Sequence, residues 1–469
     1  MKIAFLHYHL KPGGVTTVIG HQIKAVRRAG GHVMAISGER PPQAPGVEPV
    51  AIDGLAYDSK KQGGDSPELV AKAVSDAIFA RWPTGCDVLH VHNPILAKNR
   101  AFLGILKSLQ DWGHPLLLQI HDFAEDGRPG AYFSEAYPAN CHYAVINSRD
   151  YDILLQSGLK RKGLHLIENT VTPLDIFEEP IGDTHPVLYP VRAIRRKNIG
   201  EAILVSLFFS ENRPLAITLP PNSPEDFPAY EGWQAYVKQH RLPVRFEAGV
   251  GKSFPDLVRN AALILTTSVT EGFGFSFLEP WTAGKLLWGR RLGPICRDFE
   301  KNGLCLDHLY DTIDIPLDWI DSGEFLKKWQ AAVADACARF QYPIDAGVIA
   351  GAVSQMRQRG VIDFGLLNEA YQKQVLDRLI LVKGARQELI GVNRALSFPG
   401  RLADHHWRIE ANRNVVLNRY DQRSYQETLM GVYRKVMDSA SHSICKKNLL
   451  DHFLDLDRFS LLKWSDHDR

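Results

Sequence analysis

Two carboxylates, Glu271 and Glu279, flank a glycine-rich turn within the stretch Thr266 to Pro280, which reads TTSVTEGFGFSFLEP. An apolar run, Ala261 to Leu265, precedes it and predicts a buried strand, and we expect an amphipathic helix to begin at the turn. A helix N-terminus offers free N–H groups and about half a positive charge to a phosphate, and glycines let the backbone come close. Ionised carboxylates beside such a site accept hydrogen bonds from sugar or ribose hydroxyls. The stretch therefore suggests a nucleotide-sugar site, the alternative being a corner whose acids are merely solvated.

Four cations lie within six residues at Arg192, Arg195, Arg196 and Lys197. They directly follow Val187–Val191, which predicts another buried strand. A solvated charge run is the alternative, but such runs usually lie within helices or in tails. Open α/β sheets bind ligands at the carboxyl ends of their strands, and guanidinium and ammonium groups suit a diphosphate. We therefore expect these cations at a ligand site.

Polar residues also follow the predicted strands in the first half of the chain. They are His90, His92 and Asn93, then His121 and Asp122, then Asn147 and Ser148, then Asn169 and Thr170. A single histidine at such a place is more often a hydrogen-bonded structural group than a catalyst, and His121 with Asp122 is the best functional candidate. His90 and His92 share one face of a strand, which permits a metal, but no further closely spaced ligand follows. We expect no metal.

The elements that must position these residues form two α/β halves. Lys2–His7 predicts a strand, Gly13 and Gly14 a turn, the next residues an amphipathic helix, and His32–Ile36 a second strand. This β–α–β start is typical of a doubly wound parallel sheet. Further strands are predicted at 87–92, 115–120, 143–146 and 164–167, and, after a Pro-, Glu- and Gly-containing linker from Val171 to Asp183, at 187–191, 215–219 and 244–247.

Two nucleotide-binding motifs are disfavoured in detail. The turn at Gly13 and Gly14 has adjacent glycines and lacks the spaced G-x-G-x-x-G of dinucleotide-binding proteins, which argues against a dinucleotide oxidoreductase. The stretch Gly249 to Ser253 resembles the end of a P-loop, but the required first glycine is Phe246.

Composition sets the class of protein. The chain has 469 residues, which predicts two or three domains, and its 45% hydrophobic and 23% charged residues are typical of a globular protein. A formal net charge of +2 does not suggest a nucleic-acid partner. Six scattered cysteines without a C-x-x-C pair, no signal peptide and no run of about 18 apolar residues predict a cytoplasmic protein without a transmembrane segment.

The two clusters together resemble a known enzyme family. Glu271-x7-Glu279 is similar to the Glu-x7-Glu signature of retaining GT-B glycosyltransferases of the family-4 type (glycosyl transferases group 1), and Arg192-x4-Lys197 is similar to that family's diphosphate-binding pair. The resemblance implies an α/β GT-B fold with two Rossmann-like, doubly wound parallel-sheet domains that face a central cleft. We expect an acceptor domain at 1–178, a donor domain at 179–418 and C-terminal helices at 419–469 that pack back toward the first domain. A long, mostly helical section at about 311–401 departs from the family pattern.

The resemblance also implies roles for individual residues. His121, Glu271, Arg192 and Lys197 would be catalytic. Donor-binding residues would be Gly13, Gly14, Arg192, Lys197, Gly272, Phe273, Gly274, Phe275 and Glu279; acceptor-binding residues would be His92, Asn93 and Asp122. Cations would replace a metal, and no cofactor is expected.

The implied reaction is metal-independent transfer of a hexose from a UDP- or GDP-linked sugar to an acceptor hydroxyl with retention of anomeric configuration. The acceptor is left open among a small molecule, a saccharide and a lipid-linked group. A sugar phosphorylase or nucleotide-sugar epimerase of the same fold, and a catalytically silent sugar-binding protein, are the alternatives.

Overall fold

A computed structural model describes residues 1–41, 46–61, 64, 66–174, 176, 185–209, 213–400 and 405–464, with side chains of 398–400 excepted. The chain divides into two compact units. Unit 1 comprises Met1–Thr170 and Tyr420–Leu454, and unit 2 comprises Val171–Arg419 and Asp455–Arg469. The expected boundary at 178/179, most of the expected linker and the end of the helical section at Arg401 lie outside the described residues.

Unit 1 is built on a seven-stranded parallel sheet with the strand order β3-β2-β1-β4-β5-β6-β7. Its strands are β1 (Lys2–His7), β2 (His32–Ser37), β3 (Val50–Ala51), β4 (Val88–His92), β5 (Leu116–Gln119), β6 (His142–Val145) and β7 (Leu164–Leu166). Its helices are α1 (Gly14–Arg28), α2 (Pro67–Arg81), α3 (Phe102–Asp111), α4 (Ser148–Gln156), α15 (Gln422–Val436) and α16 (Lys446–Phe453). Because such strands are buried on both faces, they appear in the sequence as continuous apolar runs, and the predicted strands are confirmed to within a few residues.

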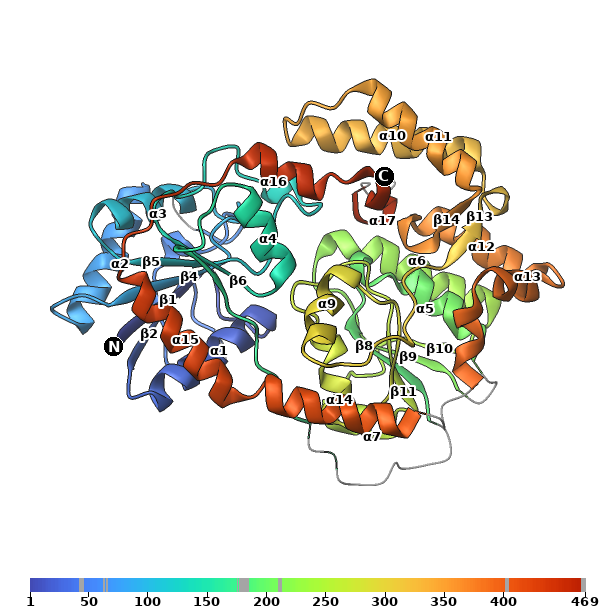
Figure 1. The fold of residues 1–469 in the computed structure, drawn as a ribbon, viewed down its shortest axis with the longest axis horizontal. Helices are drawn as coiled ribbons and strands as arrows, with labels where there is room; N and C mark the ends of the chain where they lie inside the picture. Colours follow the sequence, from blue (N-terminus) through green and yellow to red (C-terminus); the bar gives the residue numbers. More distant parts are fainter. Residues whose placement is uncertain are drawn as a thin grey trace. The chain divides into compact units, whose positions relative to one another are not determined.

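The helix α15, from the C-terminal part of the chain, packs within unit 1. It lies beside α1 (Figure 1), and Tyr425, Leu429, Val432, Tyr433 and Val436 are all buried in one cluster with residues of α1 and the sheet. Their spacing of three and four residues places them on one apolar face of the helix. Its N-terminus is capped by Asp421, whose carboxylate accepts hydrogen bonds from the backbone N–H groups of Arg423 and Ser424.

Unit 2 contains a five-stranded parallel sheet with the order β10-β9-β8-β11-β12. Its strands are β8 (Val187–Arg192), β9 (Leu215–Leu219), β10 (Val244–Arg245), β11 (Leu263–Thr266) and β12 (Leu287–Gly289). Its other helices are α5 (Ile199–Ser206), α6 (Phe227–His240), α7 (Phe254–Asn260), α8 (Glu279–Thr282), α9 (Gly293–Lys301) and α14 (His406–Arg419). Sequence analysis missed β12, a three-residue strand whose Leu-Trp-Gly composition gives little signal.

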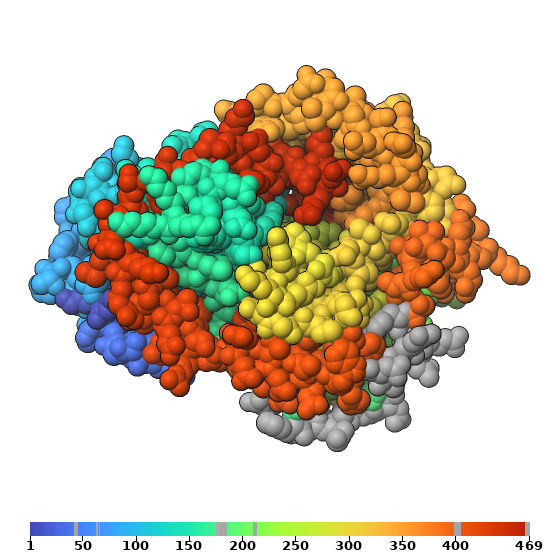
Figure 2. Space-filling model, in the orientation of Figure 1, coloured from blue at the N-terminus to red at the C-terminus, as the bar shows by residue number. Residues whose placement is uncertain are grey.

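The helical section of unit 2 begins after β12. It contains α10 (Ser322–Arg339), α11 (Ala346–Arg359), α12 (Glu369–Leu381) and α13 (Ala385–Val392), with a two-stranded antiparallel sheet of β13 (Asp314–Pro316) and β14 (Val361–Asp363). The expectation of a mostly helical section is confirmed, and the small sheet is additional. Helices α10 and α11, orange in Figure 2, form part of the surface on the face shown.

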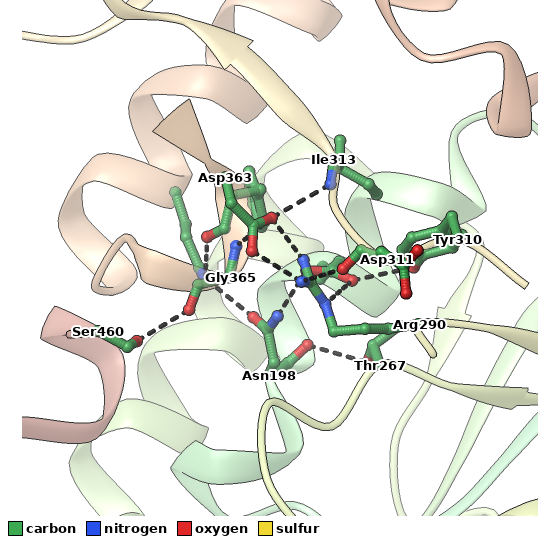
Figure 3. A network of polar contacts seen from close by, with 12 residues as sticks. Asn198, Thr267, Arg290, Tyr310, Asp311, Ile313, Asp363, Gly365 and Ser460 are labelled. Atoms are coloured by element: carbon green, nitrogen blue, oxygen red, sulfur yellow. Dashed lines mark hydrogen bonds and ion pairs between the residues drawn. The ribbon is translucent and has the colours of Figure 1, made fainter. Parts of the chain in front are cut away.

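A buried charge network attaches this section to the five-stranded sheet (Figure 3). Arg290, just after β12, donates to both carboxylate oxygens of Glu201 on α5, from Nε at 2.8 Å and Nη2 at 2.5 Å, and to both oxygens of Asp363 on β14 at 2.7 Å. The Tyr310 hydroxyl donates to Glu201 at 2.9 Å. The side chains of Glu201 and Arg290 are 0% and 5% exposed. We call these four residues the Arg290 network.

The last described residues belong to unit 2. Helix α17 (Leu461–Trp464) is preceded by Phe459, whose carbonyl accepts from Trp329 Nε1 at 3.1 Å, and by Ser460, whose hydroxyl donates to the Gly365 carbonyl at 2.8 Å. Leu461 and Leu462 are buried. Of the segment expected at 419–469, Tyr420–Leu454 belongs to unit 1 and the residues from Asp455 on belong to unit 2.

Replacing Arg290 tests the network. We expect Arg290→Met to lower the free energy of unfolding by about 3–5 kcal/mol, because Glu201 would be left buried, and Asp363 half-buried, without their cation. Arg291→Met is the matched control: Arg291 pairs with Glu300 and Asp311 but is 24% exposed, so we expect a loss of about 1 kcal/mol or less. Urea unfolding measures both, and equal losses would contradict the assigned role.

Candidate functional site

The candidate site of unit 2 lies where the strand order of its sheet reverses. Strands β8 and β11 are neighbours at the centre of the sheet, and the chain leaves them toward opposite edges, β9 and β12. Crevices at the carboxyl ends of such strands are where open α/β sheets bind ligands. The strand β8 leads into the turn η3 (Arg195–Lys197), and β11 leads into the loop with Glu271. The two predicted clusters are therefore brought together.

An ion pair between Lys197 and Glu271 joins the two clusters. Lys197 Nζ donates to Glu271 Oε1, and the side chains are only 15% and 11% exposed. Burial alone would raise the pKa of Glu271, but the charges of Lys197 and Arg196 outweigh it and the pKa of this carboxyl is lowered. Glu271 is thus held ionised beside two cations, and its carboxylate can accept hydrogen bonds from hydroxyls.

The other cations of the run have different surroundings. Arg195 forms a two-pronged ion pair with Glu369 on α12, with Nε–Oε1 and Nη2–Oε2 distances of 2.7 and 2.8 Å. Arg192, the last residue of β8, is exposed and donates to the Pro220 carbonyl at 3.3 Å. The Arg196 guanidinium makes no ion pair with any described residue, while its carbonyl accepts from the Val269 N–H at 3.0 Å. Arg192 and Arg196 thus keep donors for a ligand.

The glycine-rich turn differs from the expected helix start. A single turn of 3-10 helix, η5 (Phe275–Phe277), follows Gly274, and α8 begins only at Glu279 and has four residues. Pro280 has no N–H to bond to the carbonyl of Ser276, which prevents one continuous helix. The expected helix dipole is therefore largely missing.

Free donors remain at this turn. Gly274 has φ +90°, and a Cβ there would lie 3.0 Å from side-chain atoms of Ile295 and Phe277, so a glycine is required. The backbone N–H groups of Gly274, Phe275 and Ser276 meet no acceptor among the described residues. The Ser276 hydroxyl is buried and likewise unpartnered there, a residue that sequence analysis passed over. This set of donors suits an anion.

Glu279 differs from Glu271 in the direction in which its pKa is shifted. Burial raises the pKa of its carboxyl from 4.5 to about 7. A ligand that presents hydroxyls would replace the hydration that this carboxylate has lost.

In unit 1 four of the predicted polar residues, His92, Asn93, His121 and Asp122, gather at the ends of β4 and β5. His92 Nδ1 and His121 Nε2 are 2.8 Å apart, and both rings are buried. Burial lowers the pKa of His121 to about 4, so the ring is neutral at pH 7. Asn93, with φ +51°, accepts from the N–H groups of His121 and Asp122 at 2.9 and 3.3 Å. Asp122 pairs with Arg128 at 2.9 Å.

Gly13 and Gly14 lie at the exposed start of α1, at the end of the loop that follows β1. A Cβ on Gly14 would meet no atom within 4 Å, and Gly13 has an extended backbone with φ 170°. The fold of unit 1 therefore does not itself require glycine at either position, and their role in donor binding stays a prediction.

A metal site was not expected. Among the described residues no group of three or more His, Cys, Asp or Glu side chains is arranged to hold a metal ion. Metal independence of the reaction stays a prediction.

Comparisons with known proteins identify the fold. No family model matches the chain. In sequence it is similar to the mannosylglucosyl-3-phosphoglycerate synthase of Petrotoga mobilis, with 28% identity over 344 residues, a match that covers 63% of this chain and 66% of that protein.

Two solved structures are similar in fold. They are HepE of Anabaena in complex with UDP-glucose (TM-score 0.53, 12% identity, 92% of this chain and 99% of that chain) and a glycosyltransferase from Rickettsia africae (TM-score 0.51, 12% identity, 93% and 98%). With the two parallel sheets, these likenesses establish the expected GT-B fold of two Rossmann-like domains. Within the described part of the chain, no helix is both long enough and apolar enough to cross a bilayer.

The raised pKa of Glu279 predicts a pH-dependent effect on stability. An unfolded chain releases this proton near pH 4.5 and the folded chain near 7, so the contribution of Glu279 to the free energy of unfolding falls as pH rises through this window. We expect Glu279→Gln to be more stable than the wild type at pH 8 by about 1–3 kcal/mol, with the difference vanishing toward pH 4.5. Urea unfolding at the two pH values measures it.

Glu271→Gln is the control, because we expect its change in stability at pH 8 to have the opposite sign. Its lowered pKa stabilises the fold above about pH 4.5, and that contribution disappears as pH falls through the folded-state pKa. This variant should therefore be less stable than the wild type at pH 8. The same sign for both variants would contradict the different environments of the two carboxylates.

Proposed function

We propose that this protein is a glycosyltransferase that moves a hexose from a nucleotide-diphosphate sugar to an acceptor hydroxyl, with retention of anomeric configuration and without a metal. The observation that carries the proposal is the meeting of Lys197 and Glu271 at the point where the sheet of unit 2 reverses its strand order. The names of the Petrotoga mobilis synthase and the Rickettsia africae glycosyltransferase, and the UDP-glucose bound to HepE, support it.

The donor diphosphate would bind the cations and the glycine-rich turn. Arg192 and Lys197 would neutralise charge that develops on the departing diphosphate, and the free N–H groups of Gly274 and Phe275 would add fixed donors. Groups that are already oriented stabilise such charge without reorganisation. The weak helix dipole of the short α8 makes these N–H groups and the side-chain cations the main contributors.

The two carboxylates would accept hydrogen bonds from different hydroxyls of the donor. Glu271, ionised beside Lys197, would hold sugar hydroxyls near the anomeric carbon, while Glu279 would accept from the ribose hydroxyls. In a front-face reaction the leaving phosphate itself takes the proton of the acceptor hydroxyl as the new glycosidic bond forms and the old one breaks. Neither carboxylate then needs to act as a nucleophile.

Unit 1 would supply the acceptor side. His121, neutral and hydrogen-bonded to His92, would contact the sugar that is transferred, and Asn93 and Asp122 would contact the acceptor. We further propose a phosphorylated acceptor of the phosphoglycerate-glycoside class, in line with the name of the Petrotoga mobilis relative. An acceptor panel of phosphoglycerate glycosides, free sugars and lipid-linked saccharides separates these classes.

The first experiment identifies the donor. Thermal shift and nucleotide release are measured with UDP- and GDP-linked sugars, first without metal and then with added divalent metal. We expect one nucleotide sugar to stabilise the wild type and to be turned over without metal. Lys197→Ala should abolish the stabilisation and lower kcat/KM by about 10²–10³, because a transition-state charge would lose its partner.

Lys238→Ala, at an exposed position on α6, is the control and should behave like the wild type. If neither UDP- nor GDP-linked sugars bind under any of these conditions, the transferase proposal fails. Free sugar phosphates would then be tested, as the phosphorylase alternative requires. Product analysis distinguishes transfer from epimerisation, and any turnover excludes a silent sugar-binding protein.

A further inference from the structure

The helical section contacts the cationic turn η3 at both of its ends. At the start of the turn, Arg195 forms its two-pronged ion pair with Glu369, the first residue of α12, and the side chains are 12% and 18% exposed. The geometry uses the planar fork of the guanidinium fully. Arg195 is thereby committed to a carboxylate of the helical section and is withdrawn from the ligand set.

The other end of the turn is held by the same helix. Gln372, one turn after Glu369, donates from Nε2 to Asn198 Oδ1 at 2.8 Å, and both residues are fully buried. Asn198 directly follows Lys197 and has the left-handed values φ 51° and ψ 57°. At Gly200 a Cβ would lie 2.1 Å from Gln372 Oε1, so α12 and the start of α5 are in close contact.

The Arg290 network is connected to this arrangement through Asn198 and Glu201. Asn198 Nδ2 donates to Glu201 Oε2 at 2.7 Å, and Glu201 is held by Arg290, which also holds Asp363 of β14 (Figure 3). The carbonyl of Asn198 accepts from the Thr267 hydroxyl at 3.1 Å, just after β11. The turn is thus fixed by side-chain hydrogen bonds to α12 and α5 and by a backbone hydrogen bond to Thr267, just after β11. The backbone N–H of Arg195 also donates to Asp226 Oδ1 at 3.0 Å.

We propose that α12 of the helical section positions the phosphate-binding cations of the turn, with Glu369 as the positioning residue. This inference rests on the proposed function, since it assigns to Arg196 and Lys197 a diphosphate ligand. Glu369 touches no ligand: it acts through Arg195, whose fixed guanidinium sets the backbone direction from which the next two side chains leave. The section that departs from the family pattern then becomes a part of the donor site.

The competing explanation is an ion pair that only stabilises unit 2. The Arg291–Glu300 pair offers a matched control, because it has the same two-pronged geometry, at 2.8 and 2.6 Å, within the same unit. A purely structural role predicts that Glu369→Gln and Glu300→Gln both lower Tm and leave ligand affinity unchanged. A positioning role predicts a loss of affinity in the first variant alone.

The experiment is titration calorimetry of the full-length chain with UDP and with GDP, with Tm recorded for each variant. The variants are Glu369→Gln, Arg195→Gln, the double variant and Glu300→Gln. We expect Glu369→Gln to weaken binding of the preferred diphosphate roughly tenfold or more, because misplaced groups lose much of their effect. The double variant should bind no worse than Arg195→Gln, since Glu369 acts through Arg195, and Glu300→Gln should stay within about twofold of the wild type.

Three outcomes would overturn the inference, and they are distinguishable. Unchanged or tighter binding in Glu369→Gln, with a wild type that binds, overturns the positioning role alone. Equal losses in Glu369→Gln and Glu300→Gln reduce the effect to general stability and also overturn it. Failure of the wild type to bind either diphosphate overturns the proposed function together with this inference. If Glu369→Gln does not fold, the affinity of the double variant, which leaves no unpaired charge, is measured instead. A loss in the double variant and in Arg195→Gln, but not in Glu300→Gln, supports the positioning role, and equal affinities in all three variants contradict it.

Discussion

The buried charge of Arg290 is the constraint on which the structure of unit 2 depends. Taking a guanidinium and two carboxylates out of water costs several kcal/mol for each ion, and the cost is met only when every charge has partners of good geometry. Here Glu201 accepts from Arg290 and Tyr310, and Asp363 accepts from Arg290 and from the N–H groups of Ile313 and Gly365. Since these partners lie on α5, after β12 and on β14, the sheet and the helical section are joined by a network that tolerates little displacement.

The same network reaches the candidate site through one residue. Asn198 hydrogen-bonds to Glu201 and Gln372, and its left-handed backbone ends the turn that carries Lys197. A non-glycine residue with positive φ is uncommon, and asparagine tolerates it better than most because its short side chain can hydrogen-bond locally. The position of the Lys197 backbone is therefore fixed by buried polar contacts, and its ammonium group is paired with the Glu271 carboxylate. Rigid support of this kind allows cations to be oriented before a ligand arrives.

Local signals in the sequence were enough to predict most strands of the two parallel sheets and the clusters at their ends. Buried parallel strands are continuous apolar runs, so their ends, and hence Arg192 and Glu271, could be located without knowledge of any contact. The prediction of a helix that begins at Gly274 was wrong. Pro280 has no backbone N–H, so the 3-10 turn at Phe275–Phe277 does not continue as one helix. Glu369 could not be found at all: its partner Arg195 is 174 residues away in the chain, and a lone acid at a helix start is otherwise only a favourable residue for the helix dipole.

The ion pair between Lys197 and Glu271 affects the energetics of ligand binding. A lysine that is to bind a diphosphate is already engaged with a carboxylate, so a ligand must share or replace that partner. If Lys197 moved away with nothing else nearby, Glu271 would be left as an unpaired buried charge, which is strongly unfavourable. The charge of Arg196 also lowers the pKa of Glu271, and Arg196 has no ion-pair partner among the described residues. In the proposed function, the charge of Arg196 would keep Glu271 ionised while Lys197 is shared with phosphate, and both cations would contact the diphosphate. Arg195, which pairs with Glu369, would hold the turn and would not contact the ligand.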